Sequence, residues 1–306
     1  MALDVSIIIV NWNTADLLAQ CLRAVEQTIQ RVTYDIWVVD NASSDGSPDM
    51  VRRDFPQVRL IASAENVGFA KANNQALRLA EGRYVLLLNS DAFVEANTID
   101  RMVAFLDEHP EAGMAACKLL YEDRRLQRSC STYPTLATEF YITLGLDKLF
   151  PHSPVFGRYL MTDWDYASVR DVDVIMGAFM LVRASVLPQV GLLDESFFMY
   201  SEEVDWCYRF QQAGWKILFT PEVETVHLWG GSTATIPVET LIRLYRSRVH
   251  FFRKHYGRLT ANLFKGLLVL NCLVRIGPGA LYYLPRPQRR QKHYAFRKLL
   301  QVVPSF

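Results

Sequence analysis

Acidic and amide side chains recur in this sequence directly after short apolar runs. The clearest example is the run Tyr84–Leu88, which ends at Asn89-Ser90-Asp91. A carboxylate is a hard oxygen donor that suits Mg²⁺ or Mn²⁺, and such ions usually keep substrate phosphates as further ligands. Asp91 is therefore a candidate ligand for a divalent cation. The alternative is that Asp91 only closes a turn or caps the helix expected near Asn97.

Other apolar runs end in the same way. Polar residues end or follow the expected strands at 5–10, 35–40 and 58–62, and these are Asn11, Asn13, Asp40, Asn41 and Asn66. Segments with helical spacing lie between the runs, at 17–25 with Thr14 as the expected N-cap, from Ser47 onward and at 69–80. This alternation predicts an α/β fold in which helices flank a mainly parallel sheet. Because the carboxyl ends of parallel strands share one edge, we expect a single polar cleft there.

Several common functions are disfavoured by what the sequence lacks. No GxGxxG follows the first strand and no GxxxxGK[ST] occurs, so the dehydrogenase and P-loop interpretations are poor. Neither GxSxG nor HExxH is present, which disfavours a serine hydrolase and a zinc metalloprotease of the zincin type. The five cysteines include no CxxC pair, which suits a reducing compartment and argues against structural zinc or a disulfide scaffold.

The middle of the chain gives weaker signals. The pattern between 117 and 172 is irregular, with a hairpin expected around Asp123–Arg125. A strand is expected at 217–220, and His227 is expected in the loop after it. A single loop histidine can be structural as well as functional.

Two adjacent acids, Glu202 and Glu203, begin a predicted helix. Apolar residues from Val204 onward share one helical face, and Gly214 ends the segment. Acids in a first turn favour the helix dipole on their own, so this pair can be purely structural.

The C-terminal part is strongly basic. Residues 238–306 contain fourteen Lys or Arg and one acid, Glu239, a net charge of +13, whereas the other 237 residues carry 19 bases and 31 acids, net −12. Such a segment suits an anionic partner, either a lipid surface or nucleic acid. Its longest apolar core, Gly266–Val274, is shorter than the roughly 20 residues of a spanning helix. We expect an amphipathic extension in the membrane interface, or alternatively a helix packed on the rest of the chain.

Eight segments, taken in order, resemble a known family. They are Ser6–Asn13, Val38–Gly46, Glu65–Asn74, Leu87–Asp91, Lys118–Tyr121, Gly177–Arg183, Asp194–Tyr200 and His227–Thr233. Together they resemble family 2 nucleotide-sugar glycosyltransferases of the GT-A fold, and more narrowly the bacterial rhamnosyltransferases that build cell-envelope polysaccharides. The resemblance covers about residues 5–255 and implies a Rossmann-like GT-A catalytic domain, which we place at 1–237. The charge and helical pattern described above mark 238–306 as a basic amphipathic helical extension.

The same resemblance implies roles for the polar residues. Asp40 would accept a hydrogen bond from the N3–H of uracil or thymine, and Asp91 with His227 would hold Mg²⁺ or Mn²⁺. The residues implied to bind the nucleotide sugar are Asn11, Asn13, Asp40, Asn66, Lys71, Ser90 and Asp91. Asparagine and aspartate in turns need no function, so a structural role stays open for Asp40 and for the asparagines.

The implied reaction is a single in-line displacement that inverts the anomeric carbon. A carboxylate must take the proton of the acceptor hydroxyl, and the family's acidic pair falls on Glu202 and Glu203, with Glu203 the expected base. Two departures from the family pattern stand out. Glu203 replaces the commoner aspartate, and Asn89 stands where a second metal-binding carboxylate is usual.

The implied donor is dTDP-rhamnose, with a UDP-hexose or GDP-mannose as the alternative. The acceptor would be a glycan or lipid-linked glycan, and no nucleic acid partner is expected. The protein would lie in the cytoplasm, held peripherally on the inner face of the cell membrane. The distant alternative is a non-enzymatic membrane or nucleic-acid binding protein, which would not need acids and amides at four strand ends.

Overall fold

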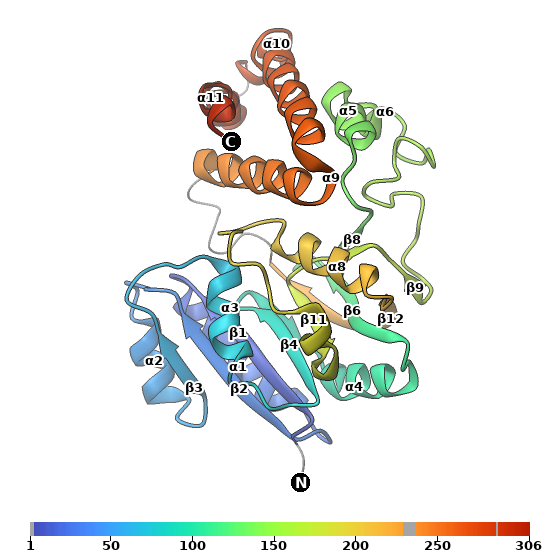
Figure 1. Cartoon of the computed structure of the whole chain (residues 1–306). Coiled ribbons are helices and arrows are strands. Elements are labelled where there is room, and N and C mark those ends of the chain that lie inside the picture. The colour runs from blue at the N-terminus through green and yellow to red at the C-terminus, as the bar shows by residue number, and fades with distance from the viewer. Residues whose placement is uncertain (1–2, 229–236, 286) are drawn as a thin grey trace. The chain divides into compact units, whose positions relative to one another are not determined.

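The computed structural model describes residues 3–228, 237–285 and 287–306 (Figure 1). Its contacts define two compact units, which we describe separately. The first unit consists of Met1–Ser131, Tyr166–Ser196 and Glu202–Ser232, and the second of Thr132–Asp165, Phe197–Ser201 and Thr233–Phe306. A catalytic domain at 1–237 followed by an extension at 238–306 stays a prediction. Residues 229–233 of the predicted segment His227–Thr233, and Arg286, lie outside the described residues.

The first unit is built on a ten-stranded sheet whose main path is β3-β2-β1-β4-β11-β6-β12-β5. These strands are β1 (Val5–Asn11), β2 (Tyr34–Asp40), β3 (Arg59–Ala62), β4 (Tyr84–Asn89), β5 (Ala92–Val94), β6 (Ala112–Leu120), β11 (Phe179–Arg183) and β12 (Lys216–His227). Parallel pairing joins β3, β2, β1 and β4, and again β6 and β12. β11 runs antiparallel between β4 and β6. The predicted mainly parallel α/β sheet is confirmed.

Four short strands complete the unit. β7 (Leu126–Gln127) pairs with β6, and β9 (Arg170–Asp171) pairs with β12. β8 (Cys130–Ser131) and β10 (Val174–Ile175) form a separate two-stranded sheet. The pairing of β6 with β7 confirms the hairpin expected around Asp123–Arg125.

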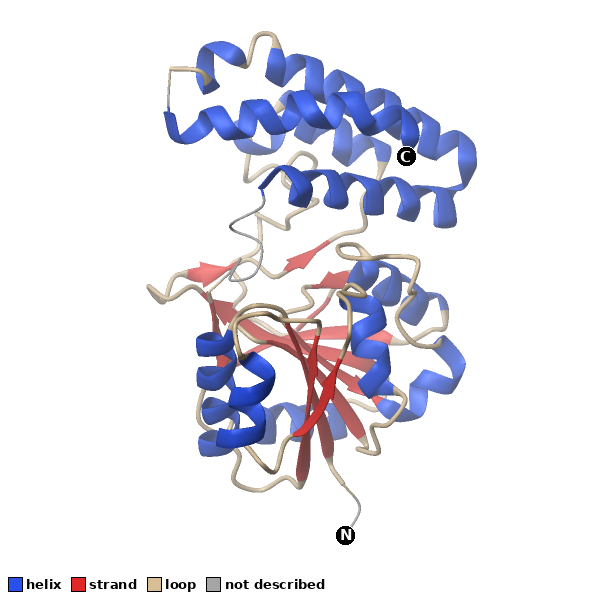
Figure 2. Cartoon of the chain, turned by 90° about the vertical axis from the view of Figure 1, so that its left-hand side faces the viewer, coloured by secondary structure: helices blue, strands red, loops and turns tan. Residues whose placement is uncertain are grey.

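Helices cover both faces of the large sheet (Figure 2). α1 (Ala15–Thr28), α2 (Ser47–Asp54) and α4 (Thr98–Glu108) share one apolar core with alternate strand residues such as Ile7, Ile9 and Leu88. α3 (Phe69–Leu77) and α8 (Glu202–Gln212) lie on the other face, to which Ile8 and Leu87 point. A short 3₁₀ turn and α7 (Leu187–Val190) precede α8.

His227 was predicted in a loop, and this prediction is wrong. The strand expected at 217–220 continues to His227 as β12, which pairs with β5 through its last residues. A register shift between Thr220 and Glu224 relative to β6 accommodates Pro221 within the strand. His227 therefore has the fixed direction of a strand residue.

The predicted cap of the first helix is only half right. Thr14 occupies the N-cap position of α1, but its side chain caps no backbone N–H. The N–H of Ala15 instead donates to the Asp45 carboxylate at 2.8 Å, from the loop after β2. The Thr14 hydroxyl can therefore form hydrogen bonds with polar side chains at the strand ends.

The second unit is helical in the described residues. Its helices are α5 (Leu136–Leu144), α6 (Leu146–Leu149), α9 (Pro237–Ile276), α10 (Ala280–Tyr283) and α11 (Pro287–Val302). α5 and α6 fall in the stretch expected to be irregular. A capping box at Thr135 and Thr138 starts α5, and this signal in the sequence was missed.

α9 is two helical arms joined at Gly257, whose φ of 85° is non-helical. The rings of Phe252 and Phe264 stack at 4.5 Å across the bend. The second arm packs on α11 through a small apolar core formed by Leu268, Cys272, Phe296, Leu299 and Val303. By length and composition alone, Val238–Ile276 is long and apolar enough to cross a membrane.

Candidate active site

A chain of hydrogen bonds joins the carboxyl ends of β2, β1 and β4. The Nδ2 of Asn11 donates to Asp40 Oδ1 at 3.0 Å, and the Thr14 hydroxyl donates to Asn11 Oδ1 at 2.7 Å. The same hydroxyl lies 3.0 Å from the hydroxyl of Ser90. All four residues are buried. The predicted polar residues of three strands therefore converge at one edge of the sheet.

Two further links tie the loops at this edge together. Asn13 has a left-handed φ of 53°, and its Oδ1 accepts the backbone N–H of Ser44 at 2.7 Å. Asn66 Oδ1 accepts Nδ2 of Asn41 at 2.9 Å and the N–H of Gly68 at 3.0 Å. Both asparagines thus organise backbone, as turn residues do.

Asp91 and His227 face one another at the same edge. Asp91 Oδ1 lies 3.3 Å from Nε2 of His227, and both side chains are nearly fully buried. Asn89 Nδ2 lies 3.3 Å from the same ring nitrogen. The other nitrogen, Nδ1, lies 2.6 Å from Oε1 of Gln127. His227 is held on both sides of its ring.

This pair fits a divalent cation with few protein ligands. Two adjacent ligands of one octahedral Mg²⁺ or Mn²⁺ ion lie about 3 Å apart, close to the observed separation. No group of three or more His, Cys, Asp or Glu gathers as a metal cage within the described part of the chain. Oxygens of a bound substrate would have to complete such a site, as is usual for Mg²⁺.

Glu202 and Glu203 lie in the first turn of α8, as predicted. Glu202 is 5% exposed, and its Oε2 has no hydrogen-bond partner among the described residues. Burial and the neighbouring Glu203 raise the pKa of the Glu202 carboxyl well above its usual range. Glu203 is only partly buried, and a methyl group placed on Gly177 would touch its Cβ at 4.0 Å. Glu202 is therefore the more deeply buried residue of the two, although Oε2 of each carboxyl is buried.

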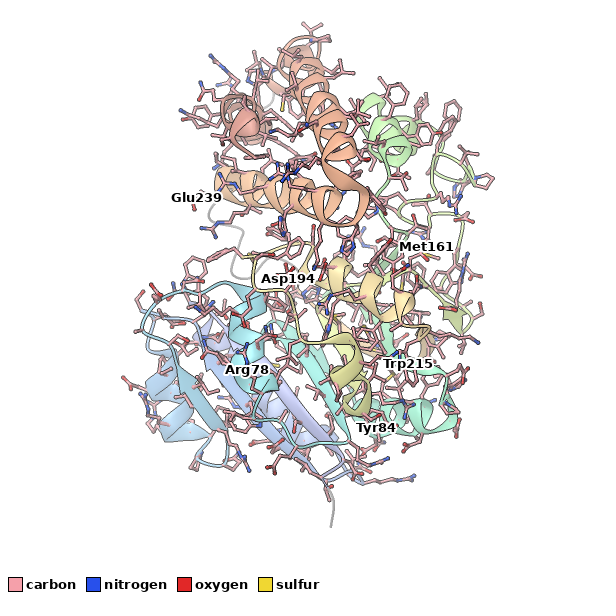
Figure 3. All side chains as sticks on the ribbon, in the orientation of Figure 1. Arg78, Tyr84, Met161, Asp194, Trp215 and Glu239 are labelled. Atoms are coloured by element: carbon pink, nitrogen blue, oxygen red, sulfur yellow. The ribbon has the colours of Figure 1, made fainter. Side chains whose placement is uncertain are left out.

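Lys71 lies apart from the hydrogen-bond chain described above. It is exposed on α3, and its charge helps to lower the pKa of Glu195, after the hydrogen bonds from Asn74 and Arg78. Arg78, labelled in Figure 3, reaches the Glu195 carboxylate at 2.6 Å. The electrostatic interaction between Lys71 and Glu195 does not by itself indicate that Lys71 binds a nucleotide.

Three residues of this edge were absent from the predicted site. Thr14 was assigned only as a cap, Asn89 only as a missing carboxylate, and Gln127 not at all. Thr14 and Asn89 could have been predicted as site residues, because both lie beside the carboxyl end of an expected strand. Gln127 carried no such signal, because its contact with His227 depends on β7 and β12 each pairing with β6.

The fold and the polar edge together define an α/β enzyme of the GT-A class. The chain belongs to glycosyl transferase family 2: that family matches residues 6–158, and the related Glycosyl transferase family group 2 matches residues 84–246. The predicted family and enzyme class are confirmed. The alternative of a non-enzymatic binding protein loses its support.

Two relatives are rhamnosyltransferases by name. The chain is 27% identical over 264 residues to N-acetylglucosaminyl-diphospho-decaprenol L-rhamnosyltransferase of Mycobacterium tuberculosis, covering 82% of this chain and 85% of the relative. It is 27% identical over 171 residues to the rhamnosyltransferase WbbL of Escherichia coli, covering 52% and 60%. These relatives confirm the similarity to the rhamnosyltransferase branch.

Solved structures share the fold. Mannosyltransferase PcManGT from Pyrobaculum calidifontis, solved with GDP-Man and Mn²⁺, gives a TM-score of 0.58 at 18% identity, covering 100% of this chain and 87% of that one. GalNAc-T7, solved with UDP, GalNAc and Mn²⁺, gives 0.55 at 14% identity, covering 82% and 50%. At such identities the likeness establishes the GT-A fold alone.

Proposed function

We propose that this glycosyltransferase moves L-rhamnose from dTDP-rhamnose to a cell-envelope glycan or lipid-linked glycan, with inversion at the anomeric carbon. The rhamnosyltransferase names of two relatives support the sugar. The observation that carries the proposal is the joined polar edge of β2, β1, β4 and β12. This edge brings together the Asp40 carboxylate to bind the nucleobase and asparagine amides to bind the phosphates. It also holds the Asp91–His227 pair, which would bind the cation.

The donor nucleotide would bind along the ends of β1, β2 and β4. Each Asp40 oxygen already accepts one hydrogen bond, Oδ1 from Asn11 and Oδ2 from the N–H of Ser43. A carboxylate oxygen has a second lone pair, so Asp40 can still accept the N3–H of thymine. Asn13, Asn66, Lys71 and Ser90 would flank the ribose and diphosphate.

Asp91 and His227 would hold Mg²⁺ or Mn²⁺ beside the diphosphate. When bound, such an ion offsets the negative charge that develops on the leaving diphosphate. The Mn²⁺ in two solved structures of the same fold supports a divalent cation. The contacts of Asp91 and His227 orient the two side chains before the donor arrives.

Glu203 would accept the proton of the attacking hydroxyl. A general base must reach its substrate, and Glu203 is the more accessible of the pair. Glu202 is buried and its raised pKa keeps the carboxyl neutral to higher pH. A neutral Glu202 places no second negative charge beside Glu203.

An anionic membrane interface would be the partner of the second unit. Leu259, Leu263, Leu270 and Leu273 are exposed and lie on one face of the second arm of α9. Glu239 is the last acidic residue of the chain, so no acid repels anionic lipid after it. Exposed basic side chains lie on either side of this stripe in the sequence: Arg258 precedes it, and Arg290, Lys292, Arg297 and Lys298 follow it in α11. The five cysteines, all unpaired and buried, suit the cytoplasm.

A donor panel tests this function. The protein is incubated with Mn²⁺ and dTDP-rhamnose, UDP-glucose or GDP-mannose, and its melting temperature is recorded. A ligand that binds only the folded state raises stability with the logarithm of its concentration over Kd. We expect dTDP-rhamnose to give the largest rise and Asp40→Ala to abolish it. A larger rise with either other donor would overturn the rhamnose assignment.

A further inference from the structure

Gln127 holds His227 at two points. It is the last residue of β7, and its side chain is fully buried. Its Nε2 lies 3.2 Å from the backbone carbonyl of His227, and its Oε1 lies 2.6 Å from Nδ1 of the same residue. The first contact needs an N–H donor, which fixes the amide with its oxygen toward the imidazole.

This orientation determines where the neutral imidazole carries its proton. The amide oxygen can only accept, so Nδ1 must be the protonated nitrogen of the ring. Nε2 then presents a lone pair, which suits the Nδ2 donor of Asn89 at 3.3 Å. That lone pair also faces Asp91 Oδ1 at 3.3 Å.

Two lone pairs that face each other at this distance repel unless a positive charge lies between them. Removing Gln127 would let the proton move to Nε2, where a hydrogen bond to Asp91 would replace the repulsion. The imidazole would then donate toward Asp91 instead of offering an acceptor. Ligating histidines commonly donate their other ring N–H to a fixed acceptor in this way.

We propose that Gln127 is a positioning residue that fixes the Nδ1–H tautomer and the ring orientation of His227, so that Nε2 is available to a cation held with Asp91. The inference rests on the proposed metal role of Asp91 and His227. Gln127 would act on the cation only through His227, which its side chain contacts at both ends of the amide. The competing interpretation is that Gln127 only satisfies buried polar groups between β7 and β12.

The tautomer is measured in metal-free protein labelled with ¹⁵N-histidine. Long-range ¹⁵N–¹H spectra distinguish protonated from unprotonated ring nitrogens, and the signal missing from His227→Gln assigns the residue. We expect Nδ1 protonated in the wild type and in Gln127→Glu, which keeps an acceptor for Nδ1. We expect a shift toward Nε2–H in Gln127→Met. An Nε2–H wild type, or an unchanged tautomer in Gln127→Met, overturns the inference.

The second readout is Mn²⁺ affinity, measured from the EPR signal of free Mn²⁺. We expect Gln127→Met to weaken binding roughly 10- to 100-fold, the range for lost outer contacts of metal ligands. Gln211→Met is the matched control, since it removes an amide that donates to the Val172 carbonyl at 3.1 Å. It should change neither readout.

The two readouts separate this inference from the proposed function. Weaker Mn²⁺ binding in His227→Gln but not in Gln127→Met overturns the positioning role alone. Unchanged Mn²⁺ binding in both His227→Gln and Gln127→Met refutes His227 as a metal ligand. The tautomer measurement then decides whether Gln127 orients the His227 ring. If Gln127→Met does not fold, the wild-type spectrum and Gln127→Glu still decide the tautomer.

Discussion

Nε2 of His227 lies 3.3 Å from Oδ1 of Asp91, although Asp91 follows β4 and His227 ends β12. The two strands are separated in the sheet by β11 and β6. The backbone closes this distance, since the N–H of Leu228 donates to the Asp91 carbonyl at 3.0 Å and His227 pairs with Ala92. The short strand β5 thus turns the chain after Asp91 toward the end of β12.

Asp91→Ala should abolish transfer while the protein still folds. Loss of a metal ligand removes several kcal/mol of charge stabilisation, so we expect a fall in kcat of about 10²-fold or more. The assay follows release of the nucleoside diphosphate, and EDTA should mimic the variant until Mn²⁺ is added back. Asp49→Asn, an exposed acid on α2, serves as the control. Full activity of Asp91→Ala would refute its role.

The acidic pair should respond asymmetrically to amide substitution. Glu203→Gln should lower kcat by roughly 10²–10⁴, the usual contribution of a general base, with little change in KM for the donor. Glu202→Gln should retain most activity, because an amide resembles the neutral carboxyl favoured by burial. Steady-state kinetics at saturating donor give both values. The reverse ranking would assign Glu202 as the base.

The buried carboxyl of Glu202 should make stability fall as pH rises. Its pKa is raised in the folded chain, so the proton stays on there after the unfolded chain has lost it above about pH 4. Unfolding then becomes easier with pH, by at most about 1.4 kcal/mol per unit, until the folded carboxyl also ionises. Urea titrations should show Glu202→Gln matching the wild type in acid and exceeding it at higher pH. If the free energies of unfolding of Glu202→Gln and the wild type differed by the same amount at every pH, this prediction would be wrong.

Thr14→Val should disconnect the ends of β1 and β4. The variant leaves Asn11 Oδ1 and the Ser90 hydroxyl without their buried partner, at a cost of roughly 1–3 kcal/mol in the free energy of unfolding. The donor KM should rise as well, since Asn11 loses its orientation. Thr28→Val is the matched control, because that hydroxyl donates only to the Ala24 and Val25 carbonyls within α1. Equal losses of stability in the two variants would argue against a special role for Thr14.

The stripe on α9 should govern membrane binding. Leu263→Glu with Leu270→Glu should weaken cosedimentation with vesicles containing anionic lipid by at least about tenfold, since each buried leucine contributes roughly 1.5–3 kcal/mol. Leu79→Glu, an exposed leucine of the first unit, should leave binding unchanged. Neutral vesicles should bind the wild type less. Undiminished binding of the double variant would show that the stripe is not the contact surface.

Much of the sheet edge could be predicted because its signals are local. Each apolar run followed by a polar residue marks a strand end, and alternation with helices places Asn11, Asp40 and Asp91 on one edge. The position of His227 was predicted wrongly because proline is a strand-ending signal and Pro221 follows the expected strand, whereas pairing with β6 and β5 continues the strand to His227. The contact of Gln127 and the burial of Glu202 depend on tertiary packing, which no local pattern encodes.

The bend at Gly257 limits what thickness of bilayer α9 could match. The first arm carries Arg243, Arg246, Arg248 and Arg253. Only the second arm therefore has an apolar length that could match the hydrocarbon core of a bilayer. A spanning arm would respond to the acyl chain length of the lipids through tilt or mismatch, whereas a helix lying flat would not. Vesicles of graded acyl chain length therefore distinguish insertion across the bilayer from attachment to one leaflet.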